Sequence, residues 1–458
     1  MPRSRRNLAI SALAAAGAIS LLAACGGAGS GSGTGGAGGV TTVTVATAAV
    51  PQFDDVRALT ETFEQQHPAI RIEYVNLPED QLRDQLTQGV ATGSSPFDVI
   101  AVGPYEVPIW SKNGWLEDLA PYAEQDADYD VEDILPTVRK GLGSDGKLFA
   151  VPFSGESSML MYRKDLFEAK GIEMPANPSW TQVAQLAAQV EDEAQGIQGI
   201  CMRGSSSWGS SLAALNPIIN TFGGVWYDQA WTPQFSSPET KRAVQFYVDL
   251  QREHGGPSAA SNGFPECLTA FGQGKAAMWF DATSAGASVE DPKTSTVAGK
   301  VGYAPAPVES FDSSGWLWSW NVAMPVTSEN KDAAWAYMRW ASSKEYVALV
   351  GEKLGLVRTP TATRESTYAD QAYLDGAPFA EISLASVRKA DPTQHPKPVP
   401  YTGVLFLGLP TYQDFGTQVS QQISAAVAGN QTVDEAVANA DKILAGVAED
   451  NKAWVEGS

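Results

Sequence analysis

The chain has 458 residues, a formal net charge of −21 and 13 tryptophans. So acidic a protein argues against nucleic acid and anionic lipid surfaces as partners, because both carry negative charge. About 420 residues follow the N-terminal segment, which is too many for one ordinary core and enough for two domains.

The N-terminal segment predicts export and lipid attachment. Three arginines within the first six residues precede an apolar stretch at 8–24 that ends at Cys25. This pattern predicts a signal peptide over residues 1–24, and its small-residue and cysteine ending resembles a bacterial lipobox. The Gly/Ser-rich run that follows predicts a flexible linker over 25–40. We expect an exported protein that touches the cell membrane only through a lipid on Cys25. The alternative is an ordinary signal peptide with a chance cysteine, and the choice between Sec and twin-arginine export stays open.

The two remaining cysteines are Cys201 and Cys267. An even pair in an oxidising compartment predicts a disulfide. Two separate buried thiols remain the alternative, because the sequence alone does not place these residues together.

The first elements of the exported part alternate between strand and helix patterns. Period-two and apolar runs predict strands, and apolar residues at helical spacing predict helices, in the order strand 42–46, helix 54–66, strand 70–75, helix 78–91 and strand 97–102. This order predicts an α/β fold with a parallel sheet and helices on its faces. Ligands of such sheets bind at the carboxyl ends of the strands, where residues 48–52 and 103–105 follow.

Later helices have recognisable starts or amphipathic patterns. A serine precedes Trp180, and Ser237-Pro238-Glu239 combines a capping residue, a first-turn proline and an acid. Further helices are expected at 330–341, 413–428 and 432–448, and a proline-rich extended loop at 391–400.

Several motifs that would indicate catalysis or a cofactor fail on their context. Residues 141–146 match GxGxxG, but a predicted helix precedes them and a strand at 147–152 follows, so the run predicts a turn. The acidic run at 126–130 lacks the glycine and the final glutamate of a calcium loop. The three histidines are far apart in the sequence. We therefore expect no cofactor, no metal site and no enzyme activity.

One constellation points to a sugar-like ligand. The segment 151–158 reads as extended and presents Glu156, while Trp316, Trp318 and Trp320 alternate and so face one side of a strand. A carboxylate accepts hydrogen bonds from neighbouring hydroxyls, and an indole face packs on the C–H surface of a sugar. We expect at least one of the three tryptophans to be a core residue instead.

Several segments resemble the family 1 extracellular solute-binding proteins, the maltose-binding-protein-like group. PFSGESSMLMYRKDLFEAKGI resembles the crossover strand and following helix start of that family, FGQGKAAMWFDATSA its Gly-Lys-Ala-Ala-Met strand, and AGNQTVDEAVANADK its C-terminal helix. NTFGGVWYD, GFPECLTAF, SSGWLWSW and YTGVLFLGLPTYQDFGTQVSQQISAAVAG resemble a subgroup, the sorbitol/mannitol-binding proteins of polyol importers. The resemblance extends from residue 41 to the end of the chain.

The resemblance implies the type II periplasmic binding-protein fold, in which two discontinuous α/β lobes enclose the ligand. It implies lobe one at 41–151 and 278–323, and lobe two at 152–277 and 324–458. It assigns Glu156 to the hydroxyl-binding acid of the crossover strand and Asp281 to a site position after the second crossover strand. From loop placement and chemistry we add Trp208, Trp316, Tyr105, Arg203 and Arg358, with surface ion pairs as the alternative role of the two arginines.

The expected function is capture of a sugar alcohol or small sugar and its delivery to the permease subunits of an ABC importer. The small segment 282–284 favours a compact ligand over a maltodextrin. The alternatives are a lipid-anchored extracellular glycan hydrolase and a binding protein for a disaccharide or oligosaccharide. We expect the protein to be a monomer.

Overall fold

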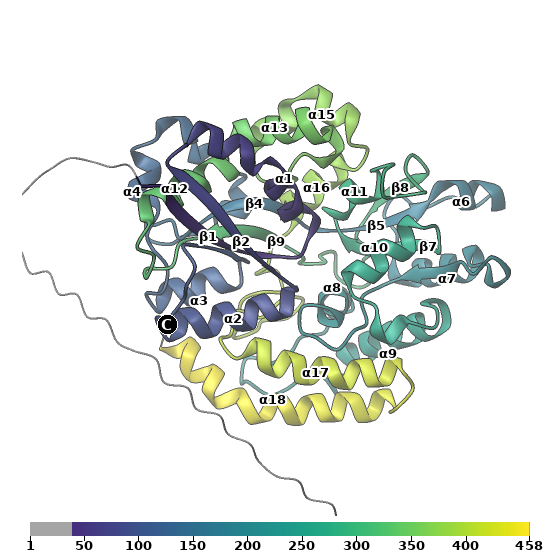
Figure 1. Cartoon of the computed structure of the whole chain (residues 1–458). Helices are drawn as coiled ribbons and strands as arrows, with labels where there is room; N and C mark the ends of the chain where they lie inside the picture. The colour runs from purple at the N-terminus through teal and green to yellow at the C-terminus, as the bar shows by residue number, and fades with distance from the viewer. Residues whose placement is uncertain (1–38, 458) are drawn as a thin grey trace, which may run out of the picture. The chain divides into compact units, whose positions relative to one another are not determined.

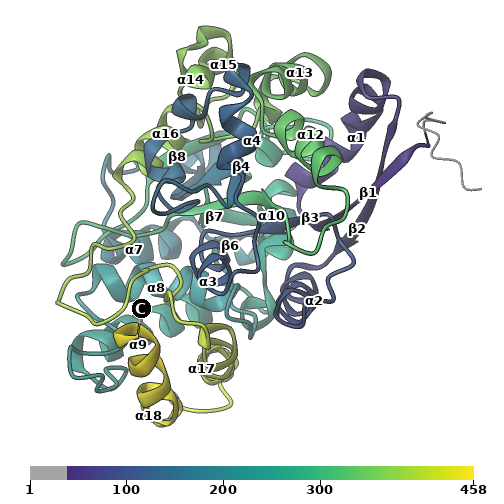
Figure 2. The same cartoon turned by 90° about the vertical axis from the view of Figure 1, so that its left-hand side faces the viewer.

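The computed structural model describes residues 39–457 and contains two β-sheets with helices packed on them (Figures 1 and 2). The expected signal peptide, Cys25 and almost all of the expected linker lie outside the described residues. None of the helices between residues 39 and 457 combines the length and the apolar character that a membrane crossing needs. The mixed α/β class predicted from the sequence is confirmed.

The first sheet confirms the predicted alternation at the start of the exported part. Its strand order is β2-β1-β3-β9-β4, with β1 parallel to β2 and β3, and β9 antiparallel to β3 and β4. All four residues of β3 are buried, as expected for a strand covered on both faces. The strands are β1 (Thr41–Ala48), β2 (Ile70–Leu77), β3 (Val99–Val102), β4 (Ala150–Glu156) and β9 (Trp318–Ala323).

The second sheet contains the four remaining strands in the order β6-β7-β5-β8. Strand β5 pairs antiparallel with β7 and β8, and β6 pairs parallel with β7. The strands are β5 (Ser158–Arg163), β6 (Gln198–Cys201), β7 (Ala276–Ala282) and β8 (Val301–Pro305).

The structure departs from the expected lobe boundaries in two places. Residues 331–341, expected in lobe two, pack on β1 and β4 of the first sheet. The sequence interpretation placed residues 278–323 with the first sheet, because it read the Gly-Lys-Ala-Ala-Met strand as a crossover. In the structure that strand is β7, which pairs with β5 over most of its length, and β8 also pairs with β5. The chain returns to the first sheet only at β9. The segment between β8 and β9 contains no strand and therefore makes the crossing.

One group of helices is associated with the first sheet. Helices α1 and α2 connect its first three strands, as predicted, while α12 packs against β1 and β4. The group consists of α1 (Pro51–Gln66), α2 (Glu79–Ala91), α3 (Glu106–Lys112), α4 (Ala120–Glu124), α5 (Pro136–Arg139), α12 (Lys331–Ala341), α13 (Lys344–Leu354), α14 (Glu365–Ala369) and α15 (Gln371–Gly376).

A second group of helices is associated with the second sheet, and α16 contacts β4 as well as β5 and β8. Ser179 starts α7 with the predicted cap, and Thr432 forms a capping box with Glu435 at the start of α18. The last helix ends eight residues later than predicted. The group consists of α6 (Lys164–Lys170), α7 (Trp180–Val190), α8 (Ser211–Thr221), α9 (Pro238–His254), α10 (Phe264–Gly272), α11 (Ala285–Val289), α16 (Ala380–Lys389), α17 (Tyr412–Val427) and α18 (Val433–Glu456).

Candidate functional site

A cavity of about 420 Å³ lies where the carboxyl ends of strands from both sheets converge. Residues that follow β1, β2, β6 and β7 line it, together with the last residue of β4. This is the edge of the sheets at which α/β proteins bind ligands. Its polar and aromatic lining includes Gln52, Glu79, Asp80, Glu156, Arg203, Ser284, Trp316, Trp318, Trp320 and Phe406.

Three tryptophans supply the aromatic surface of the cavity. Trp318 and Trp320 lie on β9 with their rings edge to face at 5.6 Å, and Trp316 precedes that strand. All three line the cavity and are at most 5 % exposed. A Cβ atom at Gly103 would lie 2.0 Å from the Trp318 ring, so only glycine allows that indole its position. The alternating spacing in the sequence therefore brings all three indoles to the same cavity.

Arg83 lies behind this surface. Its guanidinium carbon is 4.6 Å from the Trp208 ring centroid, 4.7 Å from that of Trp318 and 5.2 Å from that of Trp320. It donates to Glu79 at 2.9 Å and to the buried carboxylate of Glu106. A buried cation against three indole faces fixes their orientation. Trp208 thus contacts Arg83 and is not among the residues that line the cavity.

Glu156 lies on the cavity at the end of β4 and is 7 % exposed. Its carboxylate accepts a hydrogen bond from Ser284 Oγ. Burial raises the pKa of Glu156 to about 7, although Ser284 and the positive charge of Arg203 oppose the shift. This carboxyl group is therefore partly protonated near neutral pH, and the hydroxyls of a ligand would favour its ionised form.

Asp281 and Arg203 form a buried ion pair beside the cavity. Arg203 donates to Asp281 through Nε at 3.0 Å and through Nη2 at 2.6 Å. Asp281 also accepts from Trp279 Nε1 at 3.1 Å and from the Ala282 amide at 2.7 Å. Asp281 does not line the cavity, whereas Arg203 does. The aspartate therefore holds Arg203 in place, and its acceptor sites are occupied by the protein itself.

Tyr105 and Arg358 lie away from the cavity. The Tyr105 hydroxyl donates to the Leu409 carbonyl at 2.7 Å, and its ring packs against Trp208. Arg358 donates to Asp55 and, at 3.1 Å, to Asp291, so it forms the ion pairs that were its alternative role. Of the seven residues predicted from the sequence, the structure brings Glu156, Arg203 and Trp316 to the cavity. It places Asp281 and Trp208 one layer behind them.

Sequence reasoning missed several polar side chains of the cavity. Gln52 belongs to the segment after β1 that was predicted to face a ligand, but Glu79 and Asp80 were assigned only to the helix predicted at 78–91. Their position directly after the second predicted strand was the available signal. Asp80 also accepts from Ser207 Oγ at 3.2 Å, which joins the two sides of the cavity.

A disulfide joins Cys201 and Cys267 in the structure. The bond joins the last residue of β6 to α10. Because Cys201 is two residues before Arg203, the bond anchors the segment that carries this arginine. Among residues 39–457, no group of three or more His, Cys, Asp or Glu side chains lies close enough together to hold a metal ion. The run at 141–146 forms a turn between α5 and β4, as predicted.

Comparison with known proteins gives the family. Residues 47–348 match the model of the bacterial extracellular solute-binding proteins. The chain is 44 % identical over 393 residues to a mannitol-binding protein of Pseudomonas aeruginosa. The match covers 85 % of this chain and 89 % of that protein.

Solved structures agree in fold. An ABC transporter solute-binding protein of Agrobacterium vitis, solved with bound D-mannitol, is 45 % identical. The match has a TM-score of 0.88 and covers 90 % of this chain and 99 % of that one. A ribitol complex from Agrobacterium radiobacter is 22 % identical with a TM-score of 0.78, over 90 % of this chain and 98 % of that one, and shows the fold alone. The chain belongs to the family of bacterial extracellular solute-binding proteins.

Proposed function

We propose that this protein binds a hexitol of the D-mannitol or sorbitol type and delivers it unchanged to an ABC importer. The observation that carries the proposal is the cavity at the junction of the two sheets, which is lined by three indoles and by several carboxylates. The similarity to a mannitol-binding protein and to a D-mannitol complex, both above 40 % identity, supports the choice of ligand.

The chemistry of the cavity suits an acyclic polyol. Such a ligand offers a hydroxyl on every carbon and a chain of C–H groups between them. Glu79, Asp80 and Glu156 can accept from the hydroxyls, and Arg203 can donate to them. The tryptophan surface can pack on the carbon chain. A volume of about 420 Å³ lies toward the low end of the range for small-molecule sites, roughly 300–1,000 Å³.

Several parts of the proposal concern the whole protein. We propose two lobes: residues 41–156 with β9 and α12 to α15 around the first sheet, and residues 158–305 with α16, α17 and α18 around the second. Closure of these lobes would bury the ligand. Catalysis is not part of the proposed function. The lipid anchor at Cys25, the permease partner and the monomeric state belong to the same proposal.

Calorimetric titration of the purified protein with D-mannitol, D-sorbitol, ribitol, D-mannose and maltose tests it. We expect one hexitol to bind per chain, more tightly than the pentitol and the two sugars, and mass analysis to recover it unchanged. Preferred binding of maltose, or release of a cleaved or oxidised product, would contradict the proposal.

A further inference from the structure

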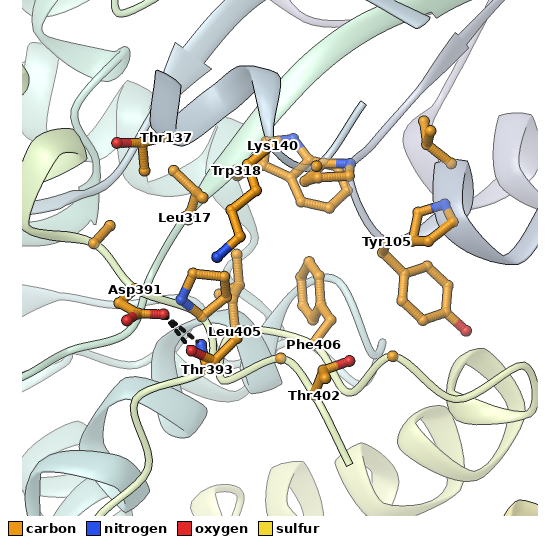
Figure 3. A pocket seen from close by; sticks show the side chains of 18 of the residues that line it. Tyr105, Thr137, Lys140, Leu317, Trp318, Asp391, Thr393, Thr402, Leu405 and Phe406 are labelled. Carbon is orange, nitrogen blue, oxygen red and sulfur yellow. Dashed lines mark hydrogen bonds between the residues drawn. The ribbon is translucent and has the colours of Figure 1, made fainter. Parts of the chain in front are cut away.

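A second and larger cavity of about 1140 Å³ adjoins the ligand cavity. The two cavities share three lining residues, which are Trp318, Leu405 and Phe406. Figure 3 shows these three side chains in the second cavity, together with Thr137 and Lys140. One layer of side chains therefore separates the ligand cavity from a chamber of more than twice its volume.

The loop 401–409 holds this layer in place. Phe406 is 9 % exposed and Leu405 is 4 % exposed. The Phe406 ring meets the Trp208 ring edge to face at 4.7 Å and the Trp318 ring at 5.4 Å. Phe406 is thus fixed by two indoles, one of which also lines the ligand cavity.

The backbone of the loop is fixed as well. Asn216 Nδ2 donates to the Leu405 carbonyl at 2.7 Å, and the Tyr105 hydroxyl donates to the Leu409 carbonyl. Gly403 has a φ of +90°, and a Cβ atom there would lie 2.0 Å from the Phe406 carbonyl oxygen. The turn therefore requires glycine, and it brings Leu405 and Phe406 between the two chambers.

The far chamber has the side-chain chemistry of a carbohydrate site. Its lining includes the aromatic rings of Tyr105 and Phe149, the hydroxyl of Thr137 and the ammonium group of Lys140. The Lys140 side chain is exposed. A sugar unit reaching this chamber would find polar and aromatic partners, so what keeps it out is the wall.

We propose that Leu405 and Phe406 set the length limit of the ligand, by closing the ligand cavity against a hexitol that carries a further glycosyl unit. This inference rests on the proposed function. Leu405 and Phe406 would restrict the ligand of that function to a free polyol. A ligand that extends past a terminal carbon of the hexitol meets Leu405 and Phe406, whose removal would join the two chambers.

The test compares two probes, D-mannitol and a mannitol that carries one α-glucosyl unit on a terminal oxygen, by calorimetric titration. The measured quantity is the ratio of the two dissociation constants. For the wild-type protein we expect the glucosyl compound to bind at least about 100-fold more weakly, a discrimination typical of steric exclusion from a shaped pocket. In Phe406→Ala the ratio should fall by at least about tenfold, and Leu405→Ala should change it in the same direction.

Thr137→Ala is the matched control, because Thr137 lines only the far chamber, and its ratio should equal that of the wild type. If Phe406→Ala shows no cooperative thermal transition, the ratio of the two dissociation constants is measured in Phe406→Leu and Leu405→Ala instead. A lower ratio in these variants than in the wild type would support the inference. Equal binding of both probes by the wild type would overturn the inference, as would an unchanged ratio in folded wall variants that still bind mannitol. A wild type that binds neither probe would overturn the proposed function, and the inference with it.

Discussion

Glu156 at the end of β4 and Asp281 near the end of β7 occupy similar places in the two sheets but have different surroundings. Glu156 lines the cavity, accepts one hydrogen bond from Ser284, and has its pKa raised to about 7 by burial. Asp281 is hidden behind Arg203 and accepts from three protein groups. The same residue class at equivalent strand ends thus serves two purposes. The first carboxylate is open to a ligand, and the second holds an arginine that reaches the ligand cavity.

Asp281→Asn should have the largest effect on stability. The substitution leaves the buried Arg203 guanidinium without its counter-charge, and breaking such a pair costs about 3–5 kcal/mol in the free energy of unfolding. Denaturant unfolding of the ligand-free protein measures it. The double variant Arg203→Gln/Asp281→Asn should recover part of the loss. A ligand-free Asp281→Asn protein as stable as the wild type would show that the pair does not have this structural role.

Removing the disulfide should destabilise the Arg203 side of the cavity. The bond closes a loop across a sequence separation of 66 residues, for which chain entropy gives roughly 4 kcal/mol as an upper figure. We expect Cys201→Ser/Cys267→Ser to lower the melting temperature in a thermal scan, and reduction of the wild-type protein to have the same effect. Identical melting of wild type and variant would show that the bond contributes no stability.

The pH dependence of binding separates the two carboxylates further. The ligand-free pKa of Glu156 is about 7, and hydroxyls that donate to its carboxylate would lower that pKa in the complex. Affinity should therefore be full above pH 7 and decrease as the pH falls, by about tenfold between pH 8 and pH 6. Titrations with D-mannitol at both values measure this. In Glu156→Gln the dependence should disappear, and a dependence that survived would have to come from another group.

The same pKa shift also affects the stability of the ligand-free protein. The folded pKa of Glu156 lies above the ordinary value of 4.5, so the folded state binds the extra proton between about pH 4.5 and pH 7. The contribution of Glu156 to the unfolding free energy therefore decreases as the pH rises through that window. Denaturation series at pH 5 and pH 8 measure this. Between the two values, the free energy of unfolding should decrease less in Glu156→Gln than in the wild type.

Sequence patterns predicted the elements and the position of the cavity better than the roles of single residues. Strand and helix periodicity identified β1, β2, β3 and the helices between them. Strand β3 is buried on both faces and leaves an apolar run, whereas β1 and β2 were recognised by their alternating residues. The spacing of the three tryptophans predicted an aromatic surface, and it forms a wall of the cavity.

The roles depend on contacts between residues far apart in the chain. Arg83 lies in the middle of an ordinary amphipathic helix, and nothing in its neighbourhood in the sequence indicates that it packs on three indoles. Asp281 and Arg203 are 78 residues apart, so the sequence could not reveal that they form an ion pair. The predicted site included both as ligand-binding residues, and only the arginine lines the cavity.

Calorimetric titration of D-mannitol into wild type and Glu156→Gln at pH 8 tests the central claim most directly. At that pH the Glu156 carboxylate is ionised, and a hydrogen bond to a charged group contributes about 1.5–3 kcal/mol. The predicted result is one mannitol per wild-type chain and a roughly tenfold to hundredfold weaker affinity in the variant, while the ligand-free variant unfolds cooperatively and is at least as stable as the wild type at this pH. Equal affinity in the two proteins would contradict the account, because Glu156 would then not contact the ligand.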